Sequence, residues 1–174
     1  MTSAEALNSV FREDLEPDFP FQDSSWIAVA FERNAYDNTR MPEWFFQTMS
    51  KHFGDFGKIA LLIAGDCFAG AGLPAVCPIP FEWESYRTFM LRPETYSVEY
   101  RMTSTDMQCG CWADADITLF GGTPVQMSAV LDELGGPERL LHHMRQEFLL
   151  GDVDGYDAMD KFFQRLLFPS KRGE

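Results

Sequence analysis

Hydrophobic residues recur at helical spacing near both ends of the chain. Residues 3–12 carry apolar side chains one turn apart, which predicts a short helix. Residues 42–53 begin with a proline and end just before Gly54, as helices commonly do. The same spacing and the same stop signals predict three further helices in the C-terminal third, over 124–134, 137–150 and about 154–168.

Other stretches have the patterns of strands. Residues 25–32 are rich in strand formers, and the largely apolar run 58–64 lies between glycines, as in a buried strand. We expect two more strands over 85–91 and 96–103, and polar side chains at every second position of 96–103 predict one solvated sheet face. Residues 70–80 contain three prolines and two glycines, which predicts an irregular loop.

Apolar and polar residues also alternate between Ala113 and Leu119. This pattern predicts a strand that presents Asp114 and Asp116 on one face. Strands followed by a run of helices are typical of an α+β fold, here an antiparallel sheet with helices packed on one face and a C-terminal helical run. A chain of 174 residues is long enough for one ordinary core, so residues 1–174 are expected to form a single domain.

Acidic residues dominate the charge of the chain. Asp and Glu number 27 against 14 Lys and Arg, a net charge of -13, which argues against nucleic-acid binding because that function needs a basic face. Residues 106–160 hold most of this excess, since only Arg139 and Arg145 are basic there. Such a field would steer a cationic partner toward the protein, although it also serves solubility.

Composition favours a soluble cytoplasmic protein. The longest apolar run, 59–64, is far shorter than the roughly 18 residues of a membrane span. The first residues lack the basic and apolar regions of a secretory signal. Three aromatic segments, 19–21, 44–46 and 80–83, are expected in the core, and any ring left exposed would be suited to anchor an interface.

The four cysteines are candidates for catalytic or metal-binding residues. Cys109-Gly110-Cys111-Trp112 is close to the signature around the nucleophile of papain-like proteases, but that nucleophile begins a long helix, whereas strand signals follow Trp112 here. Cys109 and Cys111 could form half of a zinc site, for which Cys67 and Cys77 make a poor second half. Reduced, buried thiols are the favoured interpretation, with no disulfide framework.

The Asp114-Ala115-Asp116 motif is the most suggestive chemical feature. Two carboxylates on one strand face, about 6.5–7 Å apart, could hold a divalent cation or act as acid and base. A metal-dependent hydrolase or transferase is therefore an alternative function. The basic residues that would hold a nucleotide phosphate are scarce nearby, which favours a solvated acidic face.

No motif in the sequence specifies a reaction, and no cofactor or metal is expected. In size, acidity and absence of such a motif the chain resembles bacterial toxin-immunity proteins, a resemblance of general character that matches no particular family. It implies an acidic binding or inhibitor protein that docks a basic protein partner, such as a toxin, and a structural or assembly subunit is a further alternative. The acidic residues expected to bind are Glu99, Asp114, Asp116, Asp152, Asp154 and Asp157.

Overall fold

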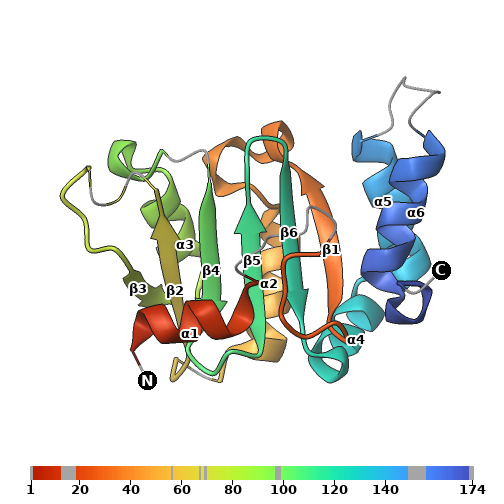
Figure 1. The fold of residues 1–174 in the computed structure, drawn as a ribbon, viewed down its shortest axis with the longest axis horizontal. Helices are drawn as coiled ribbons and strands as arrows, with labels where there is room; N and C mark the ends of the chain where they lie inside the picture. Colours follow the sequence, from red (N-terminus) through yellow and green to blue (C-terminus); the bar gives the residue numbers. More distant parts are fainter. Residues whose placement is uncertain are drawn as a thin grey trace.

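A six-stranded antiparallel sheet, in the order β1-β6-β5-β4-β2-β3, forms the centre of the computed structural model (Figure 1). The structure describes residues 2–12, 19–55, 57–66, 68, 70–96, 99–148 and 156–172. The strands are β1 (Ile27–Glu32), β2 (Ala60–Gly65), β3 (Cys77–Pro80), β4 (Tyr100–Ser104), β5 (Cys109–Ala113) and β6 (Ile117–Gly122). The helices are α1 (Ser3–Val10), α2 (Glu43–Phe53), α3 (Trp83–Met90), α4 (Pro124–Glu133), α5 (Pro137–Phe148) and α6 (Tyr156–Leu167), with short 3-10 segments η1 (Arg33–Thr39), η2 (Pro93–Thr95) and η3 (Pro169–Lys171).

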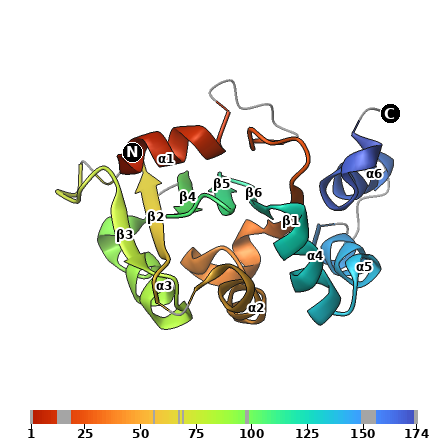
Figure 2. The ribbon, with the colours of Figure 1, turned by 90° about the horizontal axis from the view of Figure 1, so that it is seen from below.

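The α+β class that the sequence predicts is confirmed. Helices α2 and α3 pack on one face of the antiparallel sheet, and α5 and α6 lie against β1 at one edge (Figure 2). The helices predicted near the N-terminus and in the C-terminal third correspond to α1, α2, α4, α5 and α6. The strands predicted over 25–32 and 58–64 correspond to β1 and β2, and the predicted loop over 70–80 ends in β3.

The strand predicted over 85–91 is wrong, because this segment forms most of α3. Tyr86, Phe89 and Met90 are its buried residues, which is the spacing of one helix face. A short aromatic-rich segment fits both the two-residue repeat of a strand and the 3.6-residue repeat of a helix. Only packing on the sheet selects the helix. The next predicted strand begins later than expected, at Tyr100, and two residues of its predicted range, 97 and 98, lie outside the described residues.

The expectation of a solvated sheet face is wrong where α1 lies, because this helix crosses the face opposite α2 and α3 (Figure 2). Gly110 of β5 and Gly121 of β6 are directly paired. A Cβ atom at Gly110 would lie 2.8 Å from Val10, and one at Gly121 would lie 2.6 Å from Phe21. The two glycines therefore leave the room that the N-terminal segment fills.

Aromatic rings pack densely on the face that α2 and α3 cover. Phe45 of α2 lies 5.6 Å from Phe120 of β6, measured between ring centroids, and Phe46 stacks on Tyr86 at 4.7 Å. The predicted core role of the aromatic segments holds for most of their residues, whereas Trp44 is 40% exposed. This exposed indole lies beside α5, where it contacts His143.

Cys109 and Cys111 lie in this core as free, fully buried thiols, and Cys77 is also free and buried. Burial raises the pKa of both Cys109 and Cys111 to about 12. Such thiols stay protonated at neutral pH and pack as small apolar groups. Among the described residues, no group of three or more histidine, cysteine, aspartate or glutamate side chains could hold a metal ion.

Candidate functional site

Asp114 and Asp116 lie in the turn between β5 and β6, not on a strand. The continuous strand predicted after Trp112 is therefore wrong at the two aspartates, whereas its second half, from Ile117, forms β6. Asp114 Oδ1 accepts hydrogen bonds from the backbone N–H groups of Asp116 and Ile117, both at 2.8 Å. This side chain closes the turn, as aspartate often does. One oxygen of the proposed carboxylate pair is thus already used by the backbone.

Strand pairing brings three acidic residues to one end of the sheet. Tyr100, the first residue of β4, pairs with Gly65 of β2 on one side and with Ala113 of β5 on the other. The residues just beyond these positions are Asp66, Glu99 and Asp114, so their side chains lie at the ends of three neighbouring strands. The register therefore brings Glu99 and Asp114 to neighbouring strand ends, as the sequence predicts. The sequence does not predict that Asp66 lies beside them.

A hollow of about 260 Å³ opens at this end of the sheet. Asp66 and Glu99 are exposed at its walls, and Trp112 of β5, which is 9% exposed, contributes its indole. Arg101 lies directly opposite Trp112 in the sheet, so it reaches the same space. We call this space the acidic hollow; it is lined by Ala64, Gly65, Asp66, Glu99, Tyr100, Arg101 and Trp112.

Arg33 of η1 and Arg40, the residue that follows η1, both contact the neighbouring turn. Arg33 donates to the carbonyl oxygen of Ala115 at 2.9 Å, and Arg40 donates to that of Asp114 at 3.3 Å. Arg40 is 2% exposed, and burial is the first cause that lowers the pKa of its guanidinium, followed by the charge of Arg33. These cations were not expected from the sequence, because η1 precedes the turn by more than 70 residues.

Asp157, a further predicted binding residue, does not line the acidic hollow. Asp157 is exposed in the first turn of α6, a helix that lies beyond the edge strand β1 (Figure 1). Asp152 and Asp154 lie outside the described residues. The candidate site therefore consists of the acidic hollow and the exposed Asp116 beside it.

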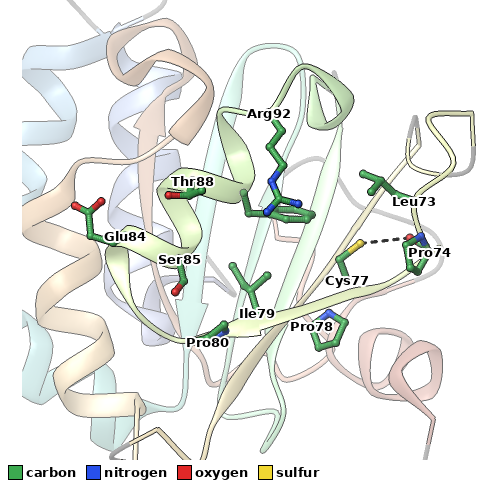
Figure 3. Close-up of a pocket in the computed structure, with 11 residues that line it drawn as sticks. Leu73, Pro74, Cys77, Pro78, Ile79, Pro80, Glu84, Ser85, Thr88 and Arg92 are labelled. Atoms are coloured by element: carbon green, nitrogen blue, oxygen red, sulfur yellow. Dashed lines mark hydrogen bonds between the residues drawn. The ribbon is translucent and has the colours of Figure 1, made fainter.

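A larger groove, of about 660 Å³, runs between the edge strand β3 and helix α3 (Figure 3). A groove of this kind can accept an added strand, which needs free backbone donors along the edge. β3 pairs with β2 through a register in which Cys77 and Ile79 alternate with Pro78 and Pro80. Proline has no N–H group to donate to β2, so the two prolines stand where the backbone N–H would point away from β2. The free edge of β3 therefore offers few donors and is protected against pairing with another strand.

No helix in the described part of the chain has the length and apolar character needed to cross a membrane. Comparisons with models of protein families, with curated proteins and with solved structures gave no match to this chain.

Proposed function

We propose that this protein binds a basic protein partner through the acidic hollow. The observation that carries the proposal is the combination of two exposed carboxylates, Asp66 and Glu99, with the indole of Trp112 in one small concave space. A lysine or arginine side chain fits such a space, because carboxylates form charge-assisted hydrogen bonds with it and an indole face attracts cations.

The surrounding charges support the same class of partner. Arg101 offsets one of the two carboxylates, and the exposed Asp116 adds a further negative charge at the adjacent turn. The net charge of -13 gives the whole protein a field that attracts basic surfaces at long range. The resemblance to toxin-immunity proteins implies that the partner is a toxin with a basic surface, which this proposal adopts.

The same geometry disfavours a metal-dependent enzyme built on Asp114 and Asp116. Asp114 Oδ1 accepts two backbone hydrogen bonds, and the carbonyl groups of Asp114 and Ala115 are engaged by arginines. A site for a divalent cation needs several oxygen ligands free to converge, and arginine is a poor neighbour for it. We therefore retain the binding function over the enzymatic one.

A fluorescein-labelled peptide of alternating arginine and glycine is a suitable probe for the acidic hollow. Fluorescence anisotropy would compare the wild type, Asp66→Asn combined with Glu99→Gln, and Asp132→Asn combined with Glu138→Gln. The second pair is a matched control, because both residues are exposed and lie on α4 and α5, away from the hollow. Circular dichroism would verify that each variant is folded.

We expect the hollow variant to weaken binding about fivefold at low salt, the effect of about 1 kcal/mol from two exposed pairs. The control variant should change the Kd by less than about twofold, and binding by the wild type should fall as salt rises. Equal losses in both variants would show that overall charge, rather than the hollow, attracts the peptide. No loss in the hollow variant would also overturn the proposal.

A further inference from the structure

Another concave site lies at the junction of α2, α4 and α5, remote from the acidic hollow. Its volume is about 380 Å³, within the range of about 300–1,000 Å³ that small-molecule sites occupy. Leu134 and Leu140 supply apolar lining, and the exposed indole of Trp44 forms a flat wall. We call this space the tryptophan cavity; it is lined by Trp44, Glu133, Leu134, Arg139, Leu140 and His143.

His143 is held in place from behind. Its Nε2 atom lies 2.8 Å from Glu147 Oε1 and 3.3 Å from the hydroxyl group of Tyr36. Glu147 is itself fixed, because it accepts hydrogen bonds from Tyr36 and from the backbone N–H of Glu32. The imidazole therefore keeps one orientation against Trp44, with 5.3 Å between the ring centroids and planes at 77°. A fixed side chain of this kind is suited to line a binding site.

The two charged residues that line the tryptophan cavity differ in their partners. Glu133, the carboxylate at its rim, is engaged by Lys51 at 2.7 Å and by His52 at 2.9 Å. Arg139 is exposed at the same rim, and no hydrogen bond or ion pair of its side chain is found among the described residues.

We infer that the tryptophan cavity binds a small organic anion with a flat aromatic body. The ring of such a ligand stacks against Trp44 and the two leucines, and its carboxylate accepts hydrogen bonds from the guanidinium of Arg139. Of the two charged residues that line the cavity, Glu133 is already engaged, which leaves the guanidinium of Arg139 for a ligand.

The probe for this inference is 2-naphthoate, followed by calorimetric titration of the full chain. Naphthalene-2-methanol keeps the rings without the charge, and acetate keeps the charge without the rings. The key variant is Arg139→Gln. The matched control is Arg92→Gln, an exposed arginine at the groove beside α3, where it also lies over an aromatic ring (Figure 3).

We expect 2-naphthoate to bind with one-to-one stoichiometry and each incomplete probe to bind at least about tenfold more weakly. Arg139→Gln should weaken the binding of 2-naphthoate about tenfold, and Arg92→Gln should leave it unchanged. Absence of binding to the folded wild type at millimolar 2-naphthoate would overturn the inference. So would a loss in Arg92→Gln without one in Arg139→Gln, because the ligand would then occupy the other groove.

Discussion

Glu147 offers the sharpest test of the packing between α5 and β1. Its side chain is only 10% exposed, and burial is the first cause that raises the pKa of its carboxyl group from 4.5 to about 7. The backbone N–H of Glu32 opposes this rise and the charge of the Glu32 side chain adds to it. The folded protein therefore binds this proton more tightly than the unfolded chain does.

The direction of the pH effect follows from that difference. The contribution of Glu147 to the free energy of unfolding is full below about pH 4.5, and it is lost as the pH rises through about 7. Each pH unit between the two pKa values is worth about 1.4 kcal/mol. Between pH 5.5 and 8.5 the full effect would be about 2 kcal/mol, and solvent screening of a group that is not fully buried reduces it to about 1–2 kcal/mol.

The perturbation is Glu147→Gln, which keeps the shape of the side chain and cannot ionise. We expect the wild type to lose about 1–2 kcal/mol relative to this variant between pH 5.5 and 8.5, measured by urea unfolding at several pH values. Glu138→Gln is the control, because Glu138 is an exposed acid of the same helix. A constant difference between the wild type and Glu147→Gln at all pH values would refute the reasoning, as would the same slope in the Glu138→Gln comparison.

Two further predictions concern the sheet. Gly121→Val should lower the free energy of unfolding by about 1–3 kcal/mol, because the valine side chain would collide with Phe21. Urea titrations would measure this loss. Unchanged stability would mean that the N-terminal segment does not pack against Gly121. Cys109 and Cys111 should resist iodoacetamide at pH 8 in the folded protein and react once it is unfolded, because they are fully buried with pKa values of about 12. Peptide mass spectrometry would follow both thiols, and rapid native labelling would contradict their burial.

The sequence predicts some of the residues that the two candidate sites contain. Glu99 and Asp114 were expected on neighbouring strands, and the paired ends of β4 and β5 bring them together. Asp66 and Trp112 carry no local signal of a shared site, because they join through the register of three strands. His143 and Glu147 stand four residues apart on one helix, a spacing that could have indicated their contact, whereas Tyr36 reaches them only through the fold.

The sequence by itself determined the α+β class, five of the helices and the two strands with continuous apolar runs, because these depend on local periodicity and on proline and glycine at helix ends. Tertiary structure decided the rest. Packing on the sheet made a helix of α3, and two facing glycines admitted the N-terminal segment to a surface that alternation alone marks as solvated. The physical reason is that burial is a property of two surfaces in contact, and a pattern along one chain segment describes only one of them.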